Sequence, residues 1–243
     1  MMSLSIDFSQ GDVQSITKDG KPVVFTYEKW FITIPAAELS AGANTLVINY
    51  SHPYATDGSG LHRFVDPENG EIYLYTDFEP YDANRLFPHF DQPDLKATFA
   101  FTAIAPAHWQ VISNNPVKQV SDLGDKKKWE FTTTPVMSTY ITALVAGPYS
   151  FIHDKYEGKK SIPLGIYCRK SLFEHLDSDE IFLVTKQGFA YFEEVFGLAY
   201  PFDKYDQIAG VDFNWGAMEN AGAVTFREDL LVFRSKVTER MYN

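Results

Sequence analysis

One stretch of the sequence concentrates carboxylates that could bind a cationic group. From Asp66 to Asp94, eight acidic residues stand against a single base, Arg85. In a recessed site such carboxylates would hold an ammonium group far more strongly than at an exposed surface. The alternative for any one of them is a solvated loop, with pairing to Arg85 or Lys96. The acids are Asp66, Glu68, Glu71, Asp77, Glu79, Asp82, Asp91 and Asp94.

A second stretch, Trp215–Phe226, has the composition of a loop that leads into a strand. Small residues surround a lone acid, Glu219, and allow another chain to approach the backbone closely. The simplest interpretation is a Gly-Ala loop that enters an edge strand. Such an edge could also bind an extended peptide by strand addition, with Glu219 placed to pair with the peptide's amino end.

Other kinds of chemistry have no motif in this chain. The six histidines are never three to five residues apart, so no His-Glu-x-x-His zinc motif is present. A Gly-x-Ser-x-Gly nucleophile elbow and the glycine-rich nucleotide-binding motifs are also missing.

The elements that must position these stretches are mostly strands. From Leu4 to about Ile152 apolar residues alternate with polar ones, as in Leu46–Tyr50, and turn pairs such as Asp19-Gly20 separate the runs. This pattern predicts an antiparallel twisted β-sheet or sandwich.

A helix and two further strands are expected after about residue 165. Asp177 and Glu180 suit a capping box, and Gly197 suits a left-handed stop. We expect strands at Tyr205–Ala209 and Ala223–Phe226, which flank a loop over Gly210–Asn220. One apolar helix face comprises Ile181, Val184, Gly188, Phe192 and Val195, and we expect core packing for Phe182, Phe189 and Phe196.

The motifs themselves resemble a known family. Gly216-Ala217-Met218-Glu219-Asn220 is similar to the exopeptidase motif of the zinc aminopeptidase N family, a gluzincin group that includes leukotriene-hydrolase-type enzymes. Upstream, Thr76–Pro80, Phe87-Pro88 and Asp91–Phe99 resemble the N-terminal signature of that family in the same order. The resemblance covers essentially the whole chain.

The resemblance implies roles for individual residues. Glu219 and Glu79 would bind the free α-amino group of a peptide substrate, and the backbone of Gly216 and Ala217 would contact the peptide. The substrate-binding set would also include the motif residues Met218 and Asn220. Trp215 would border the first side-chain pocket, with core packing as its alternative. Asp77, where the family often has glutamine, would add negative charge beside Glu79.

The resemblance also implies how the chain is organised. Residues 1–165 would form the N-terminal β domain, without its first strands, and residues 166–243 would begin an α+β, thermolysin-like catalytic domain. In the family the zinc ligands and the catalytic glutamate follow the Gly216–Asn220 motif. We therefore expect Zn²⁺ in the full-length protein, and neither zinc nor activity in this fragment.

The expected function is that of a zinc-dependent aminopeptidase acting on peptides with a free N-terminus. A leukotriene-hydrolase-like epoxide hydrolase is one alternative, although Ala217 stands where that subgroup has glycine. The other is a non-catalytic, β-rich peptide-binding module.

Charge and composition limit the partners and the cellular location that we expect for the protein. A net charge of −11 argues against nucleic acid or an anionic membrane as a partner. A single cysteine, Cys168, allows no intrachain disulfide, and neither a signal peptide nor a membrane span is evident. These features favour a cytoplasmic protein.

Overall fold

The computed structural model describes residues 2–235, which form two compact units. Of the described residues, the first unit comprises 2–62, 77–97 and 138–140, and the second comprises 63–76, 98–137 and 141–235. The predicted domain boundary at residue 165 lies inside a strand of the second unit and stays a prediction, and residues 236–243 of the predicted second domain lie outside the described residues.

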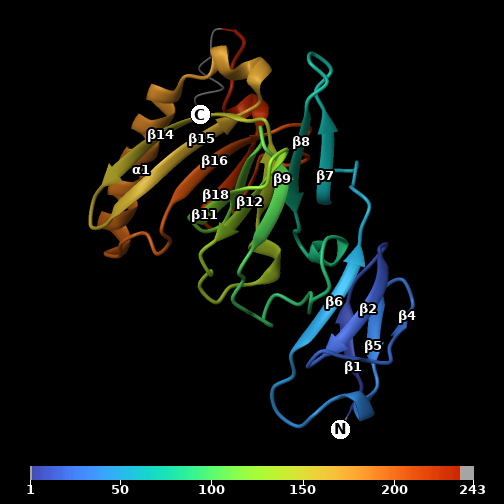
Figure 1. The fold of residues 1–243 in the computed structure, drawn as a ribbon. Coiled ribbons are helices and arrows are strands. Elements are labelled where there is room, and N and C mark those ends of the chain that lie inside the picture. Colours follow the sequence, from blue (N-terminus) through green and yellow to red (C-terminus); the bar gives the residue numbers. More distant parts are fainter. Residues whose placement is uncertain (1, 236–243) are drawn as a thin grey trace. The chain divides into compact units, whose positions relative to one another are not determined.

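The first unit contains two small antiparallel sheets around a shared core (Figure 1). Ile6, Ile16 and Ile32 come from different strands and are at most 5% exposed, so the sheets pack face to face. The turn at Asp19-Gly20 has positive φ at both residues, as predicted for a tight reversal. The strands are β1 (Leu4–Asp7), β5 (Phe31–Ile34) and β4 (Thr26–Tyr27) in one sheet, and β3 (Lys21–Pro22), β2 (Asp12–Lys18) and β6 (Leu46–Ser51) in the other.

The second unit contains two further antiparallel sheets. The division between the units passes through β7 and the end of β8. In the order in which they pair, the strands are β10 (Gln110–Ser113), β13 (Leu144–Gly147), β8 (Ile72–Asp77) and β7 (Gly60–Val65) in one sheet, and β11 (Val117–Asp122), β12 (Lys126–Phe131) and β9 (Thr102–Pro106) in the other.

A mixed five-stranded sheet carries the second candidate stretch. Its order is β14 (Ser150–Glu157), β15 (Ser161–Cys168), β16 (Tyr205–Gly210), β18 (Ala223–Arg227) and β17 (Ala217–Met218). β15, β16 and β18 run parallel, and both outer strands are antiparallel to their neighbours. The predicted strands at Tyr205–Ala209 and Ala223–Phe226 are confirmed, whereas the predicted loop between them contains β17. Short 3₁₀ helices lie at Ala36–Glu38, Ala83–Arg85, Thr139–Ile141, Lys170–His175 and Glu228–Leu230.

The predicted helix is confirmed as α1 (Ser178–Phe196), and its core face was predicted incorrectly in part. Phe182 and Phe189 pack on the sheet beside Ile162 and Leu164, as Figure 1 shows for α1 against β14 and β15. The other apolar face points to solvent, because packing on one sheet can bury only one face. Its exposed members are Val184, Phe192 and Val195, at 54–56% exposed, whereas its member Ile181 packs against the core. Phe196, for which core packing was expected, is 67% exposed, so that prediction is wrong.

The cap of α1 should measurably stabilise the fold. The Asp177 carboxylate accepts a hydrogen bond from the Glu180 amide at 3.3 Å. Replacing Asp177 by alanine removes this bond and is expected to lower the free energy of unfolding by about 1 kcal/mol. Urea denaturation would measure it, with Asp179→Ala as a matched control in the same turn. Equal losses in the two variants would contradict the capping role.

The class predicted from the sequence is confirmed: the fold is mainly β, with antiparallel sheets. Within residues 2–235, no helix combines the length and apolar character needed to cross a bilayer.

Candidate functional site

The Gly216–Asn220 stretch forms the outer half of a β-hairpin at the edge of the five-stranded sheet. In β17, Ala217 lies opposite Phe226, and Met218 lies opposite Thr225. The Arg227 amide donates to the Gly216 carbonyl at 2.9 Å and closes the open end of the hairpin. Among the described residues β17 pairs only with β18, so its other side is a free sheet edge.

The hairpin turn depends on Gly222. The Ala223 amide donates to the Asn220 carbonyl at 3.0 Å, and Gly222 has a φ of +73°. This is the conformation that the third residue of a type II turn requires. A Cβ atom at Gly222 would lie 2.3 Å from the Asn114 backbone oxygen, so no larger residue fits without a shift.

Exposure alternates along the hairpin in a way that suits peptide binding. Gly216, Ala217 and Glu219 are exposed, whereas Met218 and Asn220 are each 1% exposed. The free edge therefore presents backbone groups that can pair with an extended peptide. The Glu219 carboxylate is accessible at the end of that edge and can pair with a cation.

A tyrosine of β8 contacts the loop that precedes the hairpin. The Tyr75 hydroxyl donates to the Asp212 carbonyl at 3.0 Å, and the Tyr75 ring lies edge-on to Phe213 with centroids 5.4 Å apart. Trp215, at the end of this loop, is 57% exposed. Trp215 therefore does not pack in the core, which was the alternative to its expected place at the pocket.

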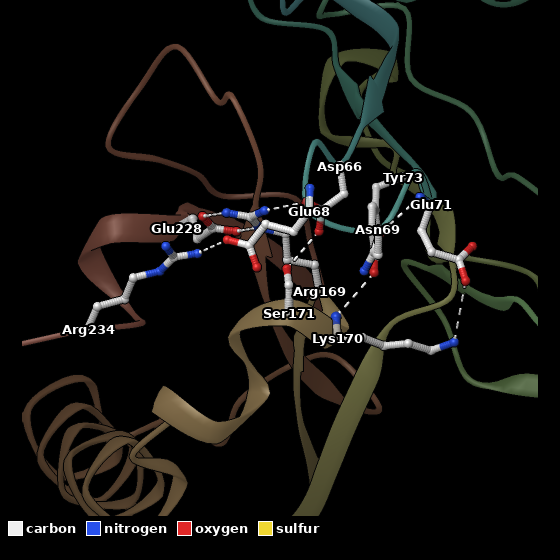
Figure 2. Close-up of polar contacts among 10 residues, drawn as sticks. All are labelled: Asp66, Glu68, Asn69, Glu71, Tyr73, Arg169, Lys170, Ser171, Glu228 and Arg234. Carbon is white, nitrogen blue, oxygen red and sulfur yellow. Dashed lines mark hydrogen bonds and ion pairs between the residues drawn. The ribbon is translucent and has the colours of Figure 1, made fainter.

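A buried arginine anchors the segment that follows β18. Arg169 donates to both carboxylate oxygens of Glu228, at 2.7 and 2.9 Å, and its third nitrogen lies 3.0 Å from Asp66 (Figure 2). Asp66 is 0% exposed and also accepts a hydrogen bond from the Ser171 hydroxyl at 2.6 Å. Because Glu228 directly follows the last residue of β18, this network fixes the open end of the hairpin.

Asp66 should make stability depend on pH in the acid range. Burial alone would raise the pKa of its carboxyl group, but donors from Ser171, the Glu68 amide and Arg169 together hold the pKa below its ordinary value. A carboxyl group with a lowered folded-state pKa stabilises the fold above its unfolded pKa, and this contribution is lost as the pH falls through the folded pKa. We therefore expect the free energy of unfolding to fall below about pH 4.

Thermal unfolding of the wild type and of Asp66→Asn between pH 2 and pH 7 would measure this dependence. The variant should lose less stability than the wild type over the acid range. The same acid dependence in both proteins would show that Asp66 is not responsible.

Several acids of the Asp66–Asp94 stretch lie against basic side chains rather than lining one open site. Glu68 pairs with Arg234 at 2.7 Å, and Asp91 lies 3.2 Å from His89. Arg85 pairs with Asp57, outside the stretch, at 2.8 Å. The ion pair of Arg85 thus forms with an acid outside the stretch.

Glu79 differs from these acids because it is exposed, and no ion pair within residues 2–235 involves it. Asp77, at the end of β8, is 2% exposed, and its carboxylate lies 3.5 Å from the Glu79 amide. Both residues belong to the first compact unit, whereas the hairpin belongs to the second. The structure therefore brings together Trp215 and Gly216–Asn220, and it places Asp77 and Glu79 in a separate unit.

The described residues do not fit a zinc site. Within residues 2–235, no cluster of three or more His, Cys, Asp or Glu side chains could hold a metal ion. The histidines make local contacts instead: His52 bonds to the Ser9 and Pro53 carbonyls, and His153 to the Tyr167 hydroxyl at 3.0 Å.

Three buried residues that support the hairpin were not predicted from the sequence. Arg169, Asn114 and Lys204 contact the hairpin or the residue after it, from 18 to 107 positions away. Each directly precedes or follows a strand, and no pattern among its sequence neighbours marks it as a contact of the hairpin.

Comparisons with known proteins support the family that the motifs resemble. The sequence model of the Peptidase M1 N-terminal domain matches residues 2–141, and that of the Peptidase family M1 domain matches residues 182–243. The M1 N-terminal domain is thus followed along the chain by the start of the M1 catalytic domain.

Curated relatives of this chain carry aminopeptidase names. Aminopeptidase N of Streptomyces lividans is 51% identical over 240 residues, which are 98% of this chain and 27% of the relative. Aminopeptidase N of Acetobacter pasteurianus is 36% identical over 81% of this chain and 56% of the relative. Aminopeptidase 2 of Candida albicans is 36% identical over 91% of this chain and 24% of the relative. The chain thus spans 24–56% of these relatives' lengths. Because the first family model covers more than half of the sequence, this chain belongs to peptidase family M1.

Proposed function

We propose that this chain is part of a longer zinc-dependent aminopeptidase and supplies the recognition of the substrate's amino end. The observation that carries the proposal is the exposed Glu219 carboxylate on the free edge of the β17–β18 hairpin. The names of the relatives support peptidase activity, and their greater length supports a longer protein.

The hairpin can account for action at chain ends. An extended peptide would pair with the backbone of Gly216 and Ala217, as an added strand does. Its terminal ammonium group would then meet the Glu219 carboxylate in a charge-assisted contact. The interior of a peptide chain offers no ammonium group at that position, so the same edge would favour the first residue of a substrate.

Other residues have proposed supporting roles. We assign Glu79 as a second carboxylate for the ammonium group, with Asp77 adding negative charge beside it. Met218 and Asn220 complete the motif from its buried side, and exposed Trp215 would border the pocket for the first side chain. The zinc ligands lie elsewhere in this proposal, so no bond-breaking step is assigned to residues 2–235.

The binding partners and the cellular location of the protein are also proposals. The net charge of −11 supports a protein that binds neither nucleic acid nor an anionic membrane. The single, buried Cys168 supports a cytoplasmic location.

Release of a chromophore from an aminoacyl substrate tests the function. The full-length protein should release it, and a chelator should abolish the release. N-acetylation of the substrate should also abolish it, whereas the 243-residue chain alone should be inactive and bind no stoichiometric zinc. Equal turnover of free and acetylated substrates by the full-length protein would contradict amine recognition.

A further inference from the structure

A buried lysine contacts the turn that follows Glu219. Lys204 directly precedes β16 and is 8% exposed. Its Nζ donates to the Gly222 carbonyl and to the Asp206 carboxylate, both at 2.7 Å. Asp206 is itself 6% exposed, and its backbone amide donates to the same Gly222 carbonyl at 3.1 Å.

The Lys204–Asp206 pair is tightly confined. A Cβ atom at Gly165 in β15 would lie 2.4 Å from an Asp206 carboxylate oxygen, so the carboxylate packs directly on the β15 backbone. Burial lowers the pKa of Lys204, and Asp206 opposes that shift. Burial of the Lys204 and Asp206 charges costs free energy, because both groups lose their water. A hairpin turn can form without any buried charge beside it. The Lys204 ammonium group also donates a hydrogen bond out of the pair, to the Gly222 carbonyl.

A second buried side chain holds the neighbouring carbonyl of the same turn. Asn114, which is 2% exposed, donates from Nδ2 to the Ala221 carbonyl at 2.9 Å. The same amide donates to the Ile141 carbonyl at 2.8 Å, and its oxygen accepts from the Ala143 amide at 2.8 Å. Asn114 therefore ties the turn to the connection between β10 and β11 and to the segment before β13.

Both central carbonyls of the Asn220–Ala223 turn are thus held by buried side chains of distant segments. Glu219 lies immediately before this turn, and its own side chain is exposed, with no ion pair in the described part of the chain. The position of its carboxylate is therefore set by the backbone on either side. On one side that backbone is β17, and on the other it is the turn held by Lys204 and Asn114.

We propose that Lys204 and Asn114 are positioning residues that fix Glu219 for recognition of a substrate's α-amino group. The proposal rests on the proposed function and extends it to two residues that do not touch the substrate. Loosening the turn would let the Glu219 carboxylate move away from the ammonium group. The loss should fall on ligands that carry that group and spare those that lack it.

Inhibition of the full-length enzyme by leucinamide and by 4-methylpentanamide tests this selectivity, because the two compounds differ only in the α-amino group. The quantity measured is the ratio of their inhibition constants. Lys204→Met should reduce the preference for leucinamide about ten-fold, the effect of roughly one lost hydrogen bond. Lys204→Arg, which keeps a cationic donor, should restore most of the preference.

Asn114→Asp gives a second route if Lys204→Met does not fold. It keeps the oxygen that accepts from Ala143 and removes the donor to Ala221, so it should reduce the preference similarly. Lys155→Met, which removes an exposed ion pair with Glu157 on β14, is the matched control and should leave the ratio unchanged.

Two outcomes would distinguish failure of the positioning role from failure of the proposed function. If Lys204→Met and Asn114→Asp weaken both compounds equally, the two residues are merely structural and the positioning role is wrong. If the wild type itself shows no preference for leucinamide, amine recognition, and with it the proposed function, is wrong.

Discussion

Replacing Glu219 by alanine in the full-length protein is expected to lower kcat/KM for release of an N-terminal residue by about 30- to 4000-fold. This range corresponds to the 2–5 kcal/mol that truncating one partner of a desolvated charge pair costs. The reason is that the substrate's ammonium group would lose water on binding and keep only Glu79 of its two proposed carboxylate partners. Steady-state kinetics with an aminoacyl substrate would measure the loss.

Two further variants make the Glu219 result specific. Glu219→Gln keeps the shape and one acceptor oxygen and should recover only part of the loss, since the charge is gone. Glu157→Ala removes another exposed glutamate of the same unit, and it should leave kcat/KM unchanged. A loss smaller than three-fold in Glu219→Ala would contradict the amine-anchoring role.

Replacing Arg169 by methionine is expected to lower the free energy of unfolding by about 3–5 kcal/mol. Arg169 bridges Glu228 and the fully buried Asp66, so its removal leaves a carboxylate in the protein interior without its cation. Methionine fills a similar volume, which separates loss of the charge from loss of packing. Denaturant unfolding followed by circular dichroism would measure the change.

An exposed arginine of the same unit provides the control for Arg169. Arg234 pairs with Glu68 at 2.7 Å, but both side chains are about half exposed. Arg234→Ala should therefore cost less than about 1 kcal/mol. If Arg169→Met costs no more than Arg234→Ala, the buried network does not stabilise the fold as inferred.

The features that could be predicted from the sequence are those with local causes. Alternation predicted β1 and β6, because neighbouring side chains of a strand point to opposite faces. Asp177 and Gly197 marked the ends of α1, because capping depends on residues within one turn. The motif residues were recognised by resemblance, and the structure places five of them on one hairpin.

The features that could not be predicted depend on contacts between distant parts of the chain. Both faces of α1 are apolar, so periodicity alone could not show that Phe182 would be buried and Phe192 exposed. β17 spans only two residues and is defined by pairing with β18 rather than by its own pattern. The contact between Asn114 and Ala221 joins residues 107 positions apart, and no local pattern encodes it.

The central claim is that the β17 edge and Glu219 bind the free amino end of a peptide. Amide chemical shifts of the ¹⁵N-labelled 243-residue chain, titrated with trialanine and with N-acetyl-trialanine, test it most directly. We predict that trialanine shifts the amides of Gly216, Ala217 and Glu219 in a saturable manner, and that the acetylated peptide does so at least ten-fold more weakly. Equal responses to the two peptides, or shifts that leave these three amides unchanged, would contradict the claim.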